Sequence, residues 1–249
     1  RDGFDAAPEL HVDSGSCITN LRFSPDGRYL AASARLSPVA FFDTKTWTKL
    51  GVSQLEVGRI ATVRWSGDGG RIAVAGSDGS CEVLNMPGGK SIAKWRAHSG
   101  SCRAAVFSPD GSVLATGGDD GVVRFWNAST WAPSGAVPIG KDIVFCLAFH
   151  PDSHILAVGD RAGRVTQVGV PEFKALASFL VGSPVMAVEF VGSRLGVGTI
   201  DGPIEIWDFA MLARCVRGAS EFWKGRVERG GAGSVIEQET DLMRVRRLP

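Results

Sequence analysis

One aromatic residue followed by a turn recurs five times along this chain of 249 residues. The first copy reads Phe23-Ser24-Pro25-Asp26-Gly27, the next three keep most of that phrase, and the fifth is shortened to Phe190-Val191-Gly192-Ser193. The leading aromatic residues lie 42, 42, 42 and 41 residues apart, at Phe23, Trp65, Phe107, Phe149 and Phe190. A fixed period of this length is typical of a supersecondary unit that buries its apolar faces by stacking on copies of itself. The period therefore predicts a fold built from five similar units.

Each unit is predicted to be a four-stranded antiparallel sheet, and the third copy shows the pattern. An apolar run ends at Phe107, and the turn Pro109-Asp110-Gly111 leads into a second run. Proline presets φ and Asp and Gly tolerate the bend, so these runs form a β-hairpin. The turn at Asp120-Gly121 introduces a third strand that ends at Trp126, and a weaker fourth strand spans 131–137. Radial stacking of five such sheets predicts a β-propeller.

The composition agrees with this fold and narrows the function classes. Glycine accounts for 32 of the 249 residues, well above its share of ~7% in ordinary proteins. Frequent turns require such an excess. The 27 basic and 26 acidic residues give a net charge of +1, which removes the simplest electrostatic case for binding nucleic acid or a membrane surface. No apolar run reaches the ~18 residues of a membrane helix. Five cysteines without a Cys-x-x-Cys pair argue against a disulfide scaffold or zinc ribbon and favour a reducing compartment.

These residues resemble the WD-repeat β-propellers. The Trp-Asp dipeptide that is the signature of that family is present as Trp207-Asp208. Near-matches in three other copies are Trp126-Asn127, Leu84-Asn85 and Phe42-Asp43. In the family, a His, a Ser or Thr, an Asp and the Trp of one blade form a hydrogen-bonded structural tetrad. The matching positions in the third copy are His98, Thr116, Asp120 and Trp126. The fifth copy keeps Asp201 and Trp207 but has Val197 at the hydroxyl position.

The repeat and the resemblance together give an expected domain organisation. We expect propeller blades over 1–217, with an orphan strand at 1–16 and five blades at about 17–50, 59–95, 101–137, 143–180 and 184–217. Because the family is most often seven-bladed, we expect these blades to be part of a seven-bladed ring. Residues 218–249 form a C-terminal extension. Its Ser234-x-x-Glu237 capping box and basic last turn predict a short helix over 235–247.

The resemblance also implies an interaction surface. In the family, partners often contact the rim where the innermost strands begin and the residue before the tetrad Asp. The expected partner-binding rim consists of Arg59, Arg103, Asp119, Phe145, Arg161 and Met186. Arg, Phe and Met are side chains that anchor protein interfaces. The alternative is that the apolar members line packed blade edges.

The sequence predicts no catalytic residue, no metal site and no cofactor. Gly88-Gly89-Lys90-Ser91 resembles the end of a phosphate loop, but the earlier glycine of that motif is replaced by Leu84 and the segment joins two strands. His150 and His154 straddle a turn and have no third ligand nearby. Asp120 and His98 are explained by the tetrad and need no acid–base role.

Three functions are consistent with these observations. The first is a non-catalytic scaffold that mediates protein–protein interactions in a multi-subunit assembly. The second is a ribonucleoprotein subunit in which Arg59, Arg103 and Arg161 contact phosphates, although the net charge disfavours it. The third is a propeller enzyme or ligand binder at the central channel. We expect an intracellular protein, in the cytoplasm or in a nuclear or ciliary and cytoskeletal assembly, with no membrane partner.

Overall fold

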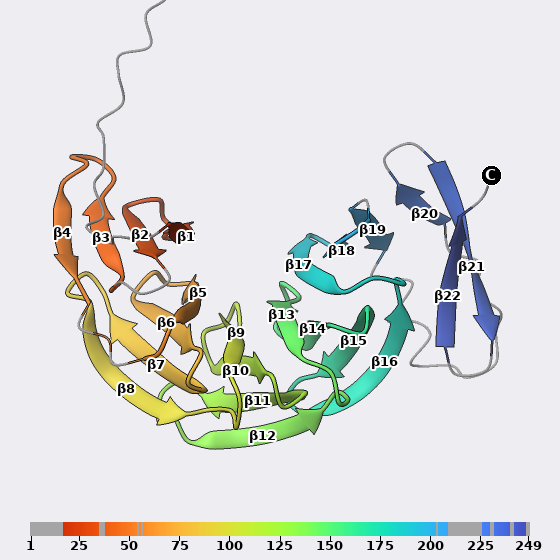
Figure 1. The fold of residues 1–249 in the computed structure, drawn as a ribbon. Helices are drawn as coiled ribbons and strands as arrows, with labels where there is room; N and C mark the ends of the chain where they lie inside the picture. Colours follow the sequence, from red (N-terminus) through yellow and green to blue (C-terminus); the bar gives the residue numbers. More distant parts are fainter. Residues whose placement is uncertain are drawn as a thin grey trace, which may run out of the picture.

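The computed structural model describes residues 17–34, 38–53, 55, 57–202, 204–208, 226–229, 232–239 and 242–247. These residues form strands and no helix, and hence none of them belongs to a helix that could cross a membrane. The sheets are arranged as sectors around a common centre, and the resulting arc is open between its first and last blades (Figure 1). The all-β propeller fold with five blades is confirmed. The orphan strand expected at 1–16 lies outside the described residues.

The first three blades are separate four-stranded antiparallel sheets. Blade 1 consists of β1 (Ile18–Phe23), β2 (Tyr29–Ala34), β3 (Ala40–Asp43) and β4 (Lys49–Val52). Blade 2 consists of β5 (Ile60–Trp65), β6 (Arg71–Gly76), β7 (Ser80–Asn85) and β8 (Lys90–Arg96). Blade 3 consists of β9 (Cys102–Phe107), β10 (Val113–Gly118), β11 (Val122–Asn127) and β12 (Pro133–Pro138). In each blade the first strand lies nearest the centre (Figure 1).

Blades 4 and 5 are parts of one ten-stranded sheet. Blade 4 consists of β13 (Val144–Phe149), β14 (Ile155–Asp160), β15 (Arg164–Gly169) and β16 (Lys174–Leu180). Blade 5 consists of β17 (Val185–Val191), β18 (Arg194–Thr199), β19 (Glu205–Asp208) and β20 (Arg226–Arg229). The remaining strands, β21 (Ala232–Glu239) and β22 (Leu242–Arg247), join β20 to the outer edge of β16.

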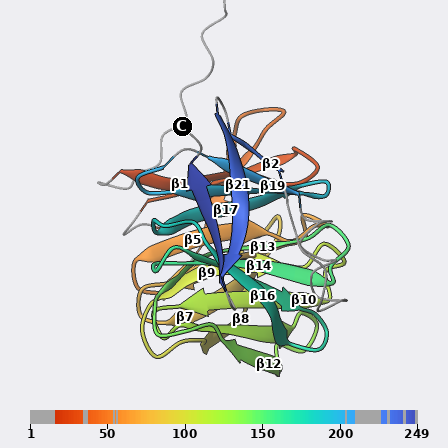
Figure 2. The same ribbon diagram turned by 90° about the vertical axis from the view of Figure 1, so that its right-hand side faces the viewer.

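The helix predicted over 235–247 is wrong, because 235–239 lie in β21 and 242–247 form β22. The two strands pair antiparallel along their length, and β22 also runs parallel to β16. Figure 2 looks onto this hairpin from the side. The capping box is a local signal, whereas β16 offers β22 a backbone partner distant in sequence, and β20 pairs with β21. The β-branched residues Val235, Ile236 and Val245 also favour strands over a helix.

The repeated turn phrase is held by its own serine and aspartate. In blade 3, the Ser108 hydroxyl donates to Asp110 Oδ1 over 2.5 Å and accepts the Val113 N–H over 3.0 Å. Blades 1 and 2 make the same pair of bonds. The glycine that ends the turn has a left-handed φ of 72° at Gly111, and Ser153 adopts 66° at the corresponding place in blade 4. This explains why Gly is present in the first three copies, since L side chains are strained there.

The apolar core lies between the blades. The rings of Phe125 and Phe173, from blades 3 and 4, have centroids 4.6 Å apart. Those of Phe179 and Trp207, from blades 4 and 5, are 4.2 Å apart. Each blade therefore depends on a neighbour to bury its faces. At the open ends of the arc, large apolar side chains are exposed, namely Leu21 at 51%, Phe23 at 55% and Ile204 at 67%.

Arg71 links blade 2 to blade 3 at the end of the blades that holds the repeated turns. Its guanidinium donates to the Ala128 carbonyl over 2.5 Å and to the Gly111 carbonyl over 3.4 Å. It also lies over two aromatic rings of blade 3, with its Cζ 5.2 Å from the centroid of Phe107 and 5.8 Å from that of Trp131. The side chain is only 22% exposed, so these bonds form in a partly desolvated site.

Replacing this arginine tests the inter-blade link. We expect Arg71→Met to lower the free energy of unfolding by about 2–3 kcal/mol, because it removes charge-assisted hydrogen bonds and two cation–π contacts. Urea denaturation followed by tryptophan fluorescence measures the change. Arg28→Met is the matched control, since Arg28 lies 5.5 Å from the Tyr29 ring but is 71% exposed. Equal effects of the two substitutions would contradict the proposed link.

Candidate functional site

Every innermost strand carries a β-bulge near its start. The strand register shifts once in each of β1, β5, β9, β13 and β17. The residue left out of the ladder is Thr19, Ala61, Arg103, Phe145 or Met186, in chain order. A bulge turns its extra side chain out of the pleat. The five bulges therefore place one side chain per blade on the same rim of the arc.

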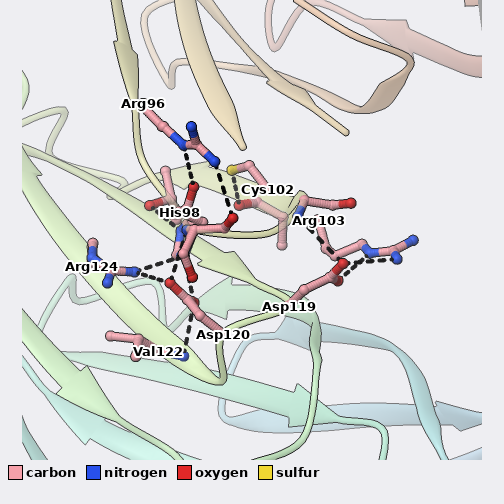
Figure 3. A network of polar contacts seen from close by, with 12 residues as sticks. Arg96, His98, Cys102, Arg103, Asp119, Asp120, Val122 and Arg124 are labelled. Carbon is pink, nitrogen blue, oxygen red and sulfur yellow. Dashed lines mark hydrogen bonds and ion pairs between the residues drawn. The ribbon is translucent and has the colours of Figure 1, made fainter. Parts of the chain in front are cut away.

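The charged part of this rim includes an ion pair in blade 3. Arg103 Nε lies 2.6 Å from Asp119 Oδ1, and a second guanidinium nitrogen lies 3.3 Å from Oδ2. The Ser101 N–H also donates to Asp119 Oδ2 over 3.3 Å. Burial alone would raise the pKa of Asp119, but the bonds from Arg103 and Ser101 lower it below its usual value. The pair therefore stays ionised, and Figure 3 shows it at the edge of the network.

The other predicted rim residues divide by chemistry. Arg59 is exposed, and its backbone N–H donates to the Ser77 hydroxyl over 2.9 Å. Arg161 is exposed and lies 3.5 Å from Asp142. Phe145 is half-buried, and Met186 is 46% exposed. The rim thus presents charges over blades 2 to 4 and apolar side chains over blades 4 and 5.

The structure brings the four tetrad residues together in blade 3. His98 Nδ1 lies 2.8 Å from Asp120 Oδ1, and His98 Nε2 lies 3.0 Å from Thr116 Oγ1. Trp126 Nε1 donates to the same hydroxyl oxygen over 3.0 Å. The Thr116 hydroxyl therefore donates to His98 Nε2, and the neutral ring donates from Nδ1 to Asp120. Both ring nitrogens, the hydroxyl and the indole N–H each have a partner in this chain of bonds. Arg124 Nη1 also lies 2.8 Å from His98 Nδ1, and it donates to Asp120 because Nδ1 carries the proton in this tautomer.

Arg124 is a fifth member of this network that sequence reasoning missed. One of its guanidinium nitrogens lies 2.8 Å from Asp120 Oδ2 (Figure 3). The position falls in the middle of β11, on the same face as Trp126. A charged residue inside an otherwise apolar strand, four positions after Asp120, is the signal that could have identified it. Arg124 gives Asp120 a full positive charge as a neighbour.

The network sets the charge of its members. Burial lowers the pKa of His98 below 6.5 despite the bond to Asp120. Burial opposes ionisation of Asp120, but the bonds from His98 and Arg124 lower its pKa to about 2. At neutral pH the ring is therefore neutral, while the carboxylate and the guanidinium are charged. This arrangement is structural, because both ring nitrogens of His98, the Thr116 hydroxyl and the Trp126 N–H bond within the network.

Blade 5 keeps only part of this arrangement. Val197 occupies the position of Thr116, and the Trp207 indole N–H has no hydrogen-bond partner among the described residues. Asp201 accepts a bond from the Ser183 hydroxyl over 3.2 Å. The indole is nevertheless buried, with 2% exposure. Apolar packing on Phe179 therefore holds blade 5 where the polar network is lost.

Two further motifs lie in turns. Lys90 begins β8, and its backbone N–H donates to Asn85 Oδ1 over 3.1 Å, so the Gly-Gly-Lys-Ser segment closes a turn between two strands. His150 Nδ1 lies 2.8 Å from Asp152 Oδ1 within its own turn. Among the residues whose placement is described, no three His, Cys, Asp or Glu side chains are grouped to hold a metal ion.

Comparison with protein families gives two matches. The model described as "WD domain, G-beta repeat" matches residues 9–36, 89–127 and 137–166. The model described as "Anaphase-promoting complex subunit 4 WD40 domain" matches residues 45–106. The two matches together span most of blades 1 to 4, including all four residues of the tetrad.

Individual proteins are similar over most of the chain. The mouse telomerase protein component 1 is 24% identical over 82% of this chain, which spans 8% of that protein. The fission yeast (Schizosaccharomyces pombe) poly(A)+ RNA export protein is 26% identical over 87% of this chain, which spans 62% of it. A chain of the solved mitotic checkpoint complex superposes with a TM-score of 0.75 at 17% identity, over 95% of this chain and 76% of its own. That last similarity is one of fold.

The tetrad can be tested by removing one hydroxyl. We expect Thr116→Val to lower the free energy of unfolding by about 2–4 kcal/mol, because it leaves a buried indole N–H and a buried ring nitrogen without partners. Val197→Thr is the matched reverse change, since it places a hydroxyl near the unpartnered Trp207 N–H. Denaturant unfolding should show a smaller cost for this variant. A larger cost than that of Thr116→Val would contradict the hydrogen-bond account.

The pKa shifts predict how stability depends on pH. Because the folded pKa of His98 is lowered, the unfolded chain binds the proton more readily, and stability falls as pH drops below about 6.5. A second loss follows between pH 3.8 and about 2, as Asp120 is protonated. Thermal melting across pH should show both losses. We expect His98→Gln to lack the first loss. Asp120→Asn should reduce the second, to which other carboxyls with a lowered pKa, such as Asp119, also contribute. An unchanged profile in His98→Gln would overturn the assignment.

Proposed function

The chain belongs to the WD-repeat family, and on this premise we propose that it is a non-catalytic scaffold that holds partner proteins in a multi-subunit assembly. The observation that carries the proposal is the set of five bulge residues on one rim. Each blade contributes one side chain there, and each side chain is free to differ because it lies outside the strand ladder. A rigid arc of blades of this kind presents several different side chains to one partner surface.

The chemistry of the rim favours a protein partner. Phe145 and Met186 supply apolar area, and Arg103 supplies a planar group that contacts both polar and aromatic surfaces. Such residues dominate the binding energy when a partner excludes water from them. Asp119 holds Arg103 in place through two contacts, so little side-chain entropy is lost on binding. The rim therefore combines an apolar anchor with an oriented charge.

The relatives support membership of an assembly. One is named as a component of telomerase, and the chain spans only 8% of that protein and 62% of the RNA export protein. Cys17, Cys81, Cys102 and Cys146 are free thiols, which suits a reducing compartment. We propose that the scaffold lies inside the cell, in the cytoplasm. The identity of the assembly follows from its partners, which affinity purification would supply.

A ribonucleoprotein subunit is the second candidate, favoured by the names of the two relatives. In this alternative the rim arginines contact phosphates. Two observations weigh against it. The net charge is +1, and Arg103 and Arg161 already face Asp119 and Asp142, so a phosphate would compete with carboxylates. RNA affinity that falls steeply with salt would favour this candidate over the scaffold.

Replacing two rim residues tests the scaffold. We expect the double variant Arg103→Ala and Phe145→Ala to lose a partner that the unmodified chain captures, with affinity reduced at least about tenfold, because an oriented charge and an aromatic anchor are both removed. Affinity purification with quantitative mass spectrometry identifies the partner, and binding of the purified pair gives the change.

The control removes a similar charge far from the rim. Arg28 lies in the turn at the opposite end of blade 1, so Arg28→Ala should leave the partner list unchanged. Thermal melting checks that the double variant remains folded. If the folded double variant captures the same partners at the same level, the rim is not the interaction surface.

A further inference from the structure

On one side of the centre, the innermost strands carry polar and charged residues. The residue directly before each repeated aromatic residue faces a small residue of the next strand, at the same level in all five blades. In blades 1 and 2 this residue is Arg22 or Arg64, and in blades 3 and 4 it is Val106 or Ala148. In blade 5 it is Glu189. The level therefore has two arginines on one side, apolar residues beyond them and one carboxylate at the far end.

The residues two positions before these also differ between blades 1 and 2 and blades 3 and 4. Blades 1 and 2 carry Asn20 and Thr62, whereas blades 3 and 4 carry Ala104 and Cys146. Asn20 and Thr62 are buried, so their polar groups face the interior and not the solvent around the disc. Two arginines, an amide and a hydroxyl thus share the inner edge of two adjacent blades.

The two arginines lie close together. Strands β1 and β5 contact each other, and the indole N–H of Trp65, next to Arg64, donates to the Arg22 carbonyl over 3.0 Å. Burial lowers the pKa of Arg64, and the charge of Arg22 lowers it further, whereas Glu189 raises it. The charge of Arg64 therefore interacts with Arg22 in the adjacent blade and with Glu189 across the centre.

Within the described residues, the hydrogen bonds of both guanidinium groups go to backbone carbonyls. Arg22 donates to the Leu21 carbonyl over 3.0 Å, and Arg64 donates to the Val63 carbonyl over 3.3 Å. Among the described side chains, no carboxylate forms an ion pair with either arginine. Arg64 is half-buried and Arg22 is exposed, and the two like charges at neighbouring positions repel each other. An anion between them would remove that repulsion.

We propose that Arg22 and Arg64 form a binding site for a small ligand that carries a phosphate group, at the inner edge of blades 1 and 2. Two guanidinium forks offer more N–H donors than the two oxygens of one carboxylate accept, whereas a phosphate presents three or more acceptor oxygens. Asn20 and Thr62 add neutral polar contacts beside it. The apolar residues of blades 3 and 4 then face the uncharged part of the ligand. The two arginines lie three positions further along β1 and β5 than the bulge residues Thr19 and Ala61.

The site is tested by calorimetric titration of the full chain with inorganic phosphate and with pyrophosphate. We expect saturable binding of one ion per chain, and we expect Arg64→Ala and Arg22→Ala each to weaken it at least about tenfold. Arg64→Lys keeps the charge but not the fork, so it should weaken binding less and remain folded. Glu189→Gln should strengthen binding a few-fold, because it removes the opposing charge.

Two controls separate this site from other sources of anion binding. Arg28→Ala removes one positive charge from the same blade, and the double rim variant Arg103→Ala and Phe145→Ala tests independence from the scaffold surface. Both should bind phosphate as the unmodified chain does. The proposal is overturned if the unmodified chain binds neither anion, if the folded Arg22 and Arg64 variants bind as well as the controls, or if citrate binds and phosphate does not.

Discussion

Apolar packing between neighbouring blades is the constraint on which the rest of the structure depends. A four-stranded sheet with two apolar faces has no core of its own, and the described aromatic contacts, such as Phe125 with Phe173, join different blades. Stability in such a fold is a sum of interfaces between neighbours. The interface between blades 2 and 3 also has a polar link, because Arg71 reaches blade 3 from blade 2. Blades 1 and 5 each leave apolar side chains exposed at the opening of the arc.

Much of this architecture follows from the sequence because its signals are local. The period of about 42 residues predicts the number of blades. In blades 1 to 3 the serine and aspartate of the repeated phrase hold the hairpin through bonds that stay within six residues. The tetrad positions follow from the resemblance to the family. Arg124 and the bulges were not predicted, because they depend on which residues face each other across strands. The expected seven-bladed ring and the strand at 1–16 remain predictions.

The C-terminal residues show how a correct local signal gives the wrong element. Ser234 and Glu237 have the spacing of a capping box, yet both lie in β21. A capping box stabilises a helix by about 1 kcal/mol. A strand that pairs on both sides, as β21 does with β20 and β22, gains a partner for backbone groups along its whole length. Single-sequence reasoning cannot weigh that gain, because the partners are set by the fold.

The tetrad and the rim are coupled through two consecutive aspartates. Asp120 is held by His98 and Arg124, while Asp119 turns to the rim and holds Arg103. The network that stiffens blade 3 therefore also orients a rim charge. Blade 5 lacks the hydroxyl of the tetrad and presents Met186 on its rim. A methionine side chain is flexible and can adapt to the surface of a partner. Loss of polar satisfaction in a blade thus coincides with a change in the chemistry of its rim, so a partner would meet one rigid, charged sector and one adaptable, apolar sector of the same disc.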